Sequence, residues 1–579
     1  MGINRPSLKH TYTLLMLSAL LFIPFAGDCP LFDWDEVNFA ECAREMVVSG
    51  NYAYAQINFK PFWEKPPFFM WMQAMAMHVF GINEFAARFP NALCGMLSLW
   101  FMYVVGTKTH NRRFGYMWAI IYTATLLPHF YFRSGIIDPW FNLFIFYATW
   151  QAYLLIHSSF KENWWRALLG GVALGLAVLT KGPAALLIAG TTVLVYIVMQ
   201  REFKVLLQPN LWLFALSALV SALSWFMVQW MTGNEQIIKT FVDYQVRLFE
   251  TGDAGHSGPF FYHALVILLG CFPASLIFLT NLHRNPQHTP AQNNLQRFMK
   301  ILFLVVLVIF SVVKTKIVHY SSLTYFPLTF IVTDAIVNAN GLPTFSKWLK
   351  PLYWLIGSVI TLALTLVTSI YLFKDRLLTS GLINDEFALG NLQAEANWTG
   401  FERIIPVLFL AGTILFYKAT FSAQKNPRLL LPALGVFIVF IWSTVVLLLP
   451  RIEEYTQHAA IDFYKEKGKG SCYIETQGFK SYAFLFYSNR LPSDYDNPEQ
   501  IKYIERQLDE MVKEGHSRIT SYGLCNLFWM EHGTTDRVAY VVTKPSEKKE
   551  MEKFPWMVKL YEKNGYVFYK RDPGPATPY

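Results

Sequence analysis

Long apolar stretches recur through the first 450 residues and are separated by short polar segments. A helix needs about 20 mostly apolar residues to cross the hydrocarbon core of a bilayer. We interpret about thirteen stretches as membrane-spanning helices, although three of them are short for a full crossing. They lie at 11–27, 86–106, 114–132, 139–157, 167–180, 183–200, 211–231, 260–280, 301–313, 321–339, 352–373, 404–417 and 429–450. The pattern predicts a polytopic α-helical membrane protein.

The pattern changes at Arg451, after which charged residues become common. Short alternating or apolar runs at 482–487, 538–542 and 566–569 predict strands, and residues 500–515 have a helical pattern. We therefore predict two domains. The first is a membrane domain over residues 1–450, and the second is a soluble α/β domain over residues 451–579.

The charges predict how the chain is oriented. The chain has a formal net charge of +9, but only 15% of its residues are charged. Lys and Arg gather in one set of alternate loops, as at Arg112, Arg113 and Lys204, which is typical of cytoplasmic loops. The opposite loops hold most of the acids. We therefore expect the loops 28–85, 232–259 and 374–402 and the soluble domain to lie outside. The basic excess follows from this topology and predicts no nucleic-acid partner.

The first outer loop holds the strongest candidate chemistry. Asp35 begins a stretch in which Asn38 and Phe39 share its helical face. Glu64 and Lys65 stand side by side before two prolines, and an acid and a base at a membrane surface are costly unless they are used. The Met- and Phe-rich residues 68–80 that follow predict a helix in the membrane plane. Helix capping and a solvated surface are the structural alternatives for these acids.

Later outer loops add further charged groups. Asp138 lies in a short loop close to the bilayer, although an Asp before a Pro is also a common helix start. The loop 232–259 carries Arg247 and His256. Lys316 lies in an outer segment with a second lysine and a histidine, where anion binding competes with snorkelling of the side chain as an explanation.

The order of these motifs resembles the GT-C class of membrane glycosyltransferases that use polyprenyl-phosphate sugars. Within that class the chain is most similar to lipid A aminoarabinose transferases, with the protein O-mannosyltransferases as more distant relatives. The matching stretches are Asp35-Glu36 through Met46, Glu64-Lys65-Pro66-Pro67, Phe85 through Pro90, Asp138-Pro139, Leu179-Thr180-Lys181-Gly182-Pro183, His256 and Lys314-Thr315-Lys316.

The resemblance implies roles for these residues. Asp35 and Asp138 would be the catalytic acids. The donor phosphate would be bound by Lys65, Lys316, His256 and Arg247. A divalent metal ion of unknown identity, held by Glu64 and His256, is a further prediction. Asn38 stands where the aminoarabinose branch has a basic residue, so the identity of the donor sugar is left open.

The implied activity is transfer of a sugar, with inversion, from an undecaprenyl- or polyprenyl-phosphate donor to an acceptor outside the cell membrane. Lipid A phosphate is the favoured acceptor. Protein or glycan O-glycosyl transfer and polysaccharide ligation are alternatives within the class, and a membrane transporter is the alternative outside it. We expect a multi-pass protein of the bacterial inner membrane. Its partners would be the lipid-linked donor, lipid A or another envelope acceptor, and membrane lipid, and its active site would face the periplasm.

Overall fold

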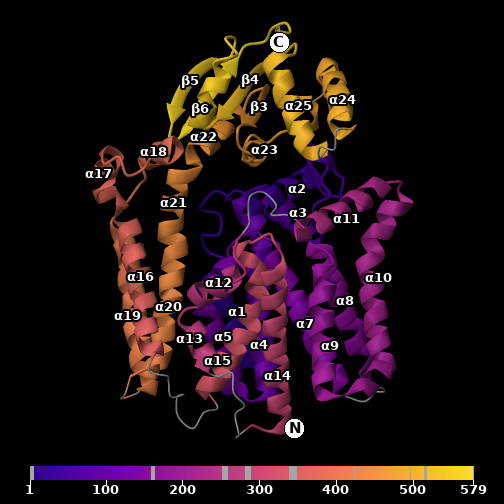
Figure 1. Ribbon diagram of the computed structural model, residues 1–579, viewed down its shortest axis with the longest axis vertical. Helices are drawn as coiled ribbons and strands as arrows, with labels where there is room; N and C mark the ends of the chain where they lie inside the picture. The colour runs from indigo at the N-terminus through magenta and orange to yellow at the C-terminus, as the bar shows by residue number, and fades with distance from the viewer. Residues whose placement is uncertain are drawn as a thin grey trace.

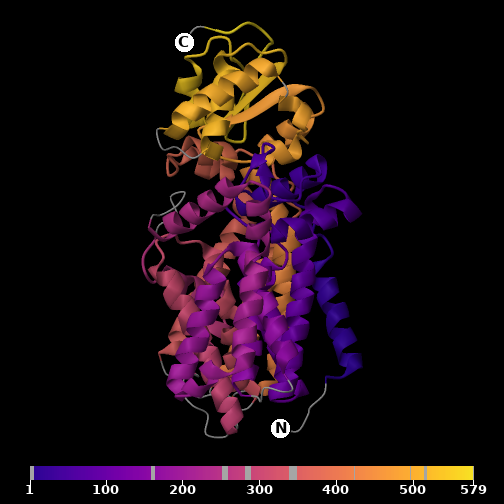
Figure 2. The same ribbon diagram turned by 90° about the vertical axis from the view of Figure 1, so that its right-hand side faces the viewer.

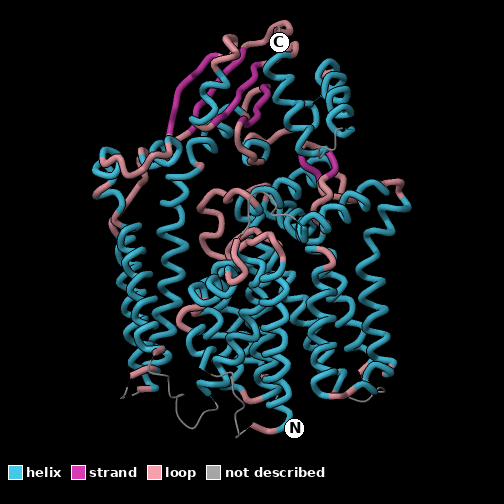
Figure 3. The backbone as a smooth tube through the Cα atoms, in the orientation of Figure 1, coloured by secondary structure: helices cyan, strands magenta, loops and turns pink. Residues whose placement is uncertain are grey.

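The computed structural model describes residues 6–157, 163–250, 258–280, 288–337, 348–422, 424, 426–495, 497–513 and 518–577. A column of long helices forms the body, and a smaller unit with a four-stranded sheet covers one end (Figures 1 and 3). We call this unit the cap and the end that carries it the outer end. The chain begins at the opposite, inner end and finishes in the cap, as the turned view also shows (Figure 2).

Within the described residues, each of the thirteen apolar stretches contains a helix or a helix pair. These elements are α1 (Leu8–Phe22), α4 (Glu84–Thr109), α5 (Arg112–Thr123), α7 (Asp138–Ile156), α8 (Trp164–Lys181), α9 (Ala184–Gln200), α10 (Pro209–Met231), α12 (Tyr262–Gly270) with α13 (Ala274–Thr280), α14 (Pro290–Val312), α15 (Tyr325–Val337), α16 (Leu349–Thr368), α19 (Ile404–Thr420) and α20 (Leu430–Ser443).

These helices support a polytopic membrane protein but do not confirm the count of thirteen spans. In the described part of the chain, six helices are long and apolar enough to cross a membrane. The number is seven if α12 and α13, which meet at a bend of 114°, form one broken span. Helices such as α5, with 12 residues, and α15, with 13, fall short of the length that a crossing needs.

A layer of shorter elements lies across the outer end of the column, between the column and the cap (Figure 1). Helix α3 occupies the residues that predicted an in-plane helix. The layer consists of α2 (Asp35–Ser49), the hairpin β1 (Gln56–Ile57) and β2 (Lys60–Pro61), α3 (Phe68–Phe80) and α11 (Glu235–Glu250). The short helices α6 (Leu126–Tyr131), α17 (Lys374–Thr379) and α18 (Glu386–Leu392) lie in other connections.

A continuous helical passage of 30 residues, Pro427–Thr456, leads from the column into the cap. It includes α20, a π-helical turn at Thr444–Leu448, and α21 (Leu449–Thr456). The predicted domain boundary at residues 450 and 451 therefore falls inside a helix rather than in a linker. The α20–α21 helix carries the chain directly up to the cap (Figure 1).

The cap has a sheet in the order β3-β4-β6-β5, in which β3 and β4 are parallel and the other pairs antiparallel. Residues 482–487, predicted as a strand, form part of a helix instead. The strands are β3 (Cys472–Gln477), β4 (Val538–Thr543), β5 (Val558–Lys563) and β6 (Tyr566–Arg571), and the helices are α22 (His458–Lys467), α23 (Ala483–Tyr487), α24 (Pro498–Lys513), α25 (Arg518–His532) and α26 (Lys548–Met551).

The cap shares a hydrophobic core with the outer layer. Phe39 of α2 and Phe69 of α3 belong to the same buried cluster as Phe463 of α22 and Phe484 of α23. A further link is polar, since the backbone N–H of Leu31 donates a hydrogen bond of 2.7 Å to the hydroxyl of Tyr487. The cap is therefore packed onto the layer that carries the candidate acids.

Candidate active site

A cavity of about 650 Å³ lies at the outer end, and we call it the reaction cavity. Its wall includes the start of α2, the segment before α3, the 130–137 connection, the end of α8, α11 and the turn that follows α14. Apolar side chains such as Phe130, Val445 and Leu449 line it together with charged ones. A cavity of this mixed character suits a ligand with both apolar and charged parts.

Two carboxylates share one histidine in this cavity. The Nε2 atom of His319 lies 3.3 Å from Oδ2 of Asp35 and 3.5 Å from Oδ2 of Asp138. Asp138 is the first residue of α7 and is almost fully buried, whereas Asp35 is half-buried at the start of α2. The structure therefore brings together two predicted acids that are 103 residues apart in the chain (138 minus 35).

The positive groups around Asp35 favour its ionised form. Burial raises the pKa of Asp35, but the hydrogen bond and charge of His319 act together with the charges of two lysines and hold the pKa below its ordinary value. These lysines are Lys65 and Lys181. Asp35 is therefore a carboxylate at neutral pH and can accept a proton or a hydrogen bond.

Lys181, at the end of α8, forms an ion pair with one of these two acids. Its Nζ atom donates a hydrogen bond of 2.5 Å to Oδ1 of Asp138. The ammonium also lies 4.3 Å from the ring centroid of Tyr320, within the range of a cation–π contact. The ring centroid of Phe141 lies 5.7 Å away, so one carboxylate and two aromatic rings hold this cation in the cavity wall.

A second cation approaches from the outer layer. Nζ of half-buried Lys65 donates a hydrogen bond of 3.3 Å to the hydroxyl of Tyr244 on α11 and lies 4.7 Å from the centre of that ring. Arg247 also packs against Tyr244, with its guanidinium carbon 5.2 Å from the ring centroid. Lys65, Tyr244 and Arg247 all line the reaction cavity.

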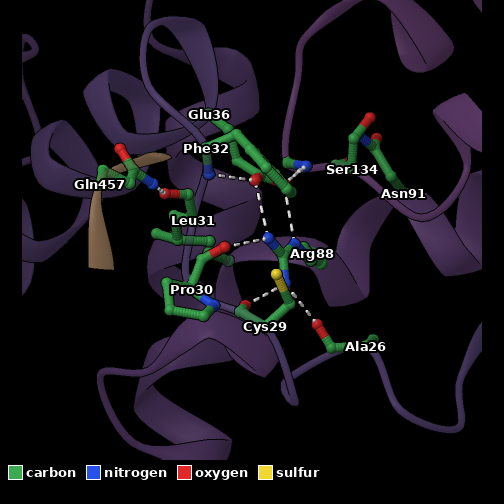
Figure 4. A network of polar contacts seen from close by, with 12 residues as sticks. Ala26, Cys29, Pro30, Leu31, Phe32, Glu36, Arg88, Asn91, Ser134 and Gln457 are labelled. Carbon is green, nitrogen blue, oxygen red and sulfur yellow. Dashed lines mark hydrogen bonds and ion pairs between the residues drawn. The ribbon is translucent and has the colours of Figure 1, made fainter. Parts of the chain in front are cut away.

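A buried ion pair fixes the start of α2 (Figure 4). The guanidinium of Arg88 on α4 donates to both carboxylate oxygens of Glu36, each at 2.8 Å. The same guanidinium donates to the carbonyl oxygens of Ala26, Cys29 and Pro30. Because these donors satisfy the buried charge, the pair holds the chain around residues 26–36 in one arrangement.

Glu36 also joins α2 to the loop that precedes Asp138. Its carboxylate accepts hydrogen bonds from the backbone N–H groups of Phe32 and Gly135, at 2.8 and 2.5 Å. Burial raises the pKa of Glu36, but Arg88 and these donors outweigh it and keep the pKa below its ordinary value. Since Asp35 is the neighbour of Glu36, the network sets the position of Asp35 relative to Asp138.

Other predicted site residues are placed differently. Lys316 does not line the cavity; its Nζ atom donates to the carbonyls of Phe310, Ser311 and Val313, which stabilises the end of α14. The physical reason is that a lysine at this position can reach the unpaired carbonyls of its own preceding helix. His256 lies outside the described residues.

Glu64 lines the reaction cavity. In the described part of the chain, no group of three or more His, Cys, Asp and Glu side chains is arranged to hold a metal ion. The predicted partner His256 lies outside those residues, so the metal ion stays a prediction.

Lys181 and His319 are site residues that the sequence analysis did not assign. Lys181 lies in the Leu179–Pro183 motif, and His319 lies three residues after Lys316 in the same outer segment. Each was therefore inside or next to a stretch that resembles the family. Only their contacts with Asp138 and Asp35, which join four separate parts of the chain, identify them as site residues.

Several known proteins are similar to this chain. A family model described as dolichyl-phosphate-mannose-protein mannosyltransferase matches residues 64–227, which include Lys65, Asp138 and Lys181. The undecaprenyl phosphate-alpha-4-amino-4-deoxy-L-arabinose arabinosyl transferase of Shewanella sediminis is 27% identical over 345 residues. That alignment covers 59% of this chain and 61% of the relative's length. An uncharacterised protein of Aquifex aeolicus is 24% identical over 79% of this chain and 81% of its own.

The chain also matches a solved structure over nearly its whole length. The crystal structure of ArnT from Cupriavidus metallidurans bound to undecaprenyl phosphate superposes with a TM-score of 0.73 at 17% identity, covering 99% of this chain and 100% of that one. At this identity the likeness establishes the fold, and a fold alone does not establish a reaction. The chain thus has the ArnT fold and resembles the polyprenyl-phosphate-dependent GT-C glycosyltransferases.

Proposed function

We propose that this chain is a membrane glycosyltransferase that moves a sugar from a polyprenyl-phosphate donor to an acceptor at the outer end. The observation that carries the proposal is the pair Asp35 and Asp138, which share His319 beside Lys181 in a cavity at the end of an apolar column. The relatives named as undecaprenyl-phosphate arabinosyl transferases support the same donor class.

The cations of the cavity suit the leaving group. When the bond between sugar C1 and the phosphate oxygen breaks, its electron pair stays on the lipid phosphate as negative charge. Lys65, Lys181 and Arg247 line the cavity and would stabilise that charge. In a site shielded from water, one such contact contributes about 3–4 kcal/mol to lowering the barrier. Lys316 has no part in this proposal, because its ammonium is engaged with the end of α14.

The acids suit the acceptor. If the acceptor is a hydroxyl, Asp35 takes its proton as the new bond to C1 forms from the face opposite the phosphate, which inverts C1. If the acceptor is a phosphate, as on lipid A, its oxygen is already anionic and no proton moves, so Asp35 orients the acceptor through a hydrogen bond or through His319. Asp138 keeps Lys181 and His319 in position. No step in this scheme passes through a metal ion.

Lipid A phosphate is the acceptor we favour, because the aminoarabinose transferases are prominent among the relatives. O-glycosyl transfer to protein is the second candidate. One observation favours it, since the family model that matches residues 64–227 is described as a protein mannosyltransferase. Both reactions use the same donor chemistry, so the acceptor has to be decided by experiment.

The proposed location is the bacterial inner membrane, with the reaction cavity and the cap on the periplasmic face. The bias of Lys and Arg toward the inner end supports this orientation, as at Arg112 and Arg113, the first two residues of α5. A polyprenyl tail would then remain in the bilayer while its phosphate reaches the cavity.

The test follows a radiolabelled polyprenyl-phosphate-sugar pool into lipid A, protein and polysaccharide in membranes that contain the protein. We expect label in one fraction with the wild type, and loss of that label with Asp35→Asn and with Lys65→Met. Asp462→Asn and Lys553→Met, which change exposed residues of the cap, are matched controls. Equal labelling by wild type and the Asp35 variant would reject the proposed site. Solute movement without any donor would favour a transporter.

The metal ion is tested in the same assay. We propose that Glu64, with His256, contributes to any divalent-ion site. Treatment with EDTA followed by Mg²⁺ or Mn²⁺ should then remove and restore activity in the wild type. Unchanged transfer after EDTA treatment would reject this part of the proposal.

A further inference from the structure

A second cavity, of about 780 Å³, lies between the outer layer and the cap. We call it the cap cavity. Its wall is formed by the β1–β2 hairpin and the start of α11 on one side, and by the end of β3, the loop before α23, α24 and α25 on the other. It is a separate cavity from the reaction cavity, but Lys480 lines both. The two cavities are thus neighbours on either side of one loop of the cap.

The wall of the cap cavity is rich in groups that recognise neutral polar ligands. Asn58, Asn234 and Gln236 bring side-chain amides, and Trp63 brings a large aromatic ring. Amides donate and accept hydrogen bonds at once, as adjacent sugar hydroxyls require. An aromatic ring covers the apolar face of such a ligand. These groups suit the sugar part of a ligand, while apolar residues such as Ile237 and Leu508 line other parts of the wall.

Buried polar groups add to this character. Glu475 accepts a hydrogen bond of 3.0 Å from the amide of Asn526, whose oxygen accepts one of 2.6 Å from Gln500. The hydroxyl of Tyr482, in the loop between the cavities, is buried and has no hydrogen-bond partner within the described residues. A buried hydroxyl without a partner costs about 1–3 kcal/mol, which a bound polar group would offset.

Lys480 supplies a cation at the junction. Its Nζ atom lies 4.9 Å from the ring centroid of Trp34, the residue before Asp35, and 5.4 Å from that of Tyr482. Within the described residues no carboxylate forms an ion pair with this exposed ammonium. It is therefore available to an anionic group that enters from either cavity.

We propose that the cap cavity binds the sugar head group of the acceptor, and that Lys480 binds the acceptor's anionic group where the two cavities meet. The inference rests on the proposed function, because a transfer reaction needs two binding sites that meet at the reacting carbon. The reaction cavity, next to the apolar column, suits the donor. The cap cavity is walled by the outer layer and the cap and presents its polar groups beside that site.

The test measures binding rather than turnover. Purified full-length protein in lipid nanodiscs is titrated with lipid A, with dephosphorylated lipid A, and with undecaprenyl phosphate, in the absence of donor sugar. Lys480→Met removes the junction cation, and Gln236→Trp fills the cap cavity from an exposed position of α11. Lys553→Met, at an exposed residue after α26 that lines neither cavity, is the control.

We expect Lys480→Met to weaken lipid A binding about tenfold, the change for loss of one charge-assisted contact. It should leave undecaprenyl phosphate binding and dephosphorylated lipid A binding unchanged. Gln236→Trp should weaken both forms of lipid A. Unchanged lipid A binding in both variants, no lipid A binding by the wild type, or an equal loss of undecaprenyl phosphate binding would each overturn the inference. Lipid A binding that depends on Lys480, in a protein that transfers no sugar, would instead overturn the proposed function and leave this site standing.

Discussion

The two ends of the helical column each hold a histidine–aspartate group, and the two groups differ in what surrounds them. At the inner end, Oδ1 of Asp334 lies 2.9 Å from Nε2 of His288 and 3.7 Å from that of His110, and Oδ2 accepts a hydrogen bond of 3.0 Å from Gln296. At the outer end, His319 lies between Asp35 and Asp138 in the wall of the reaction cavity.

The comparison shows that residue type alone does not identify a catalytic group. Asp334 is buried, has His288 and Gln296 within 3.0 Å of its two oxygens, and lines neither of the two cavities described above. Asp35 and His319 of the outer group line the reaction cavity together with the cations Lys65 and Lys181, and only Asp138 is buried behind them. We infer that the inner group stabilises the packing of α14 and α15, whereas the outer group is available to substrate.

The largest expected effect separates the two groups directly. With a hydroxyl acceptor, Asp35→Asn should lower kcat by about two to four orders of magnitude, as for loss of the group that takes the proton, and with a phosphate acceptor by less. Tm should change little in either case, because Asp35 is only half-buried. Asp334→Asn should lower Tm while the protein that remains folded keeps its kcat. Kinetics and thermal unfolding of both variants check this. Similar losses of kcat in the two variants would break the comparison.

A second experiment tests whether Glu36, the neighbour of Asp35, stabilises the fold as the inner group does. Glu36→Gln leaves the buried guanidinium of Arg88 without its counter-charge, which costs about 3–5 kcal/mol of stability. We expect a lower Tm for this variant, whereas Glu466→Gln, at an exposed residue of the cap, should leave Tm unchanged. An unaltered Tm in Glu36→Gln would show that the ion pair does not hold the start of α2.

A third experiment compares lysines. Lys65→Met should lower kcat/KM by about 10²-fold, because Lys65 lines the reaction cavity and would contact the leaving phosphate. Lys316→Met should keep kcat/KM close to that of the wild type and lower Tm, because its ammonium bonds only carbonyls at the end of α14 among the described residues. The opposite result would restore the phosphate-binding role that the sequence predicted for Lys316.

The smallest expected effect concerns Glu475. The groups around this acid compensate its negative charge less than those around Asp35 do. Burial raises the pKa of Glu475 from 4.5 to about 7, although the hydrogen bond from Asn526 opposes this. The folded state then binds a proton more tightly than the unfolded chain, so this residue makes stability fall as pH rises from about 4.5 to about 7. Glu475→Gln should therefore raise Tm relative to the wild type more at pH 8 than at pH 5. Equal shifts in Tm at the two pH values would contradict the raised pKa.

Much of the architecture could be predicted because it depends on local properties. The lengths of the apolar stretches located the helices of the column, and the strands at 538–542 and 566–569 and the helix near 500–515 are present. The strand predicted at 482–487 was wrong, because an apolar aromatic run of six residues is compatible with a buried strand or a buried helix. The segment 482–487 packs between the outer layer and α22, and in that position its residues form a helix.

The candidate site was predictable in part. Asp35, Glu64, Lys65, Asp138 and Arg247 were singled out from outer-loop sequence, and all five line or adjoin one cavity. The choice between Lys181 and Lys316 could not be made from sequence, since both lie at the outer ends of apolar helices. The direction in which each ammonium points decides which lysine lines the reaction cavity. That direction depends on whether a carboxylate or a helix end lies within reach of the side chain.

The sequence by itself determined that this protein is a membrane-embedded helical protein with a charged C-terminal part, because hydrophobic length and the placement of Lys and Arg are properties of the chain alone. Tertiary structure decided which charges act together. The contact of His319 with Asp35 and Asp138, and the meeting of the two cavities at Lys480, join residues far apart in the chain. Only packing brings such groups within the few ångströms over which hydrogen bonds and ion pairs form.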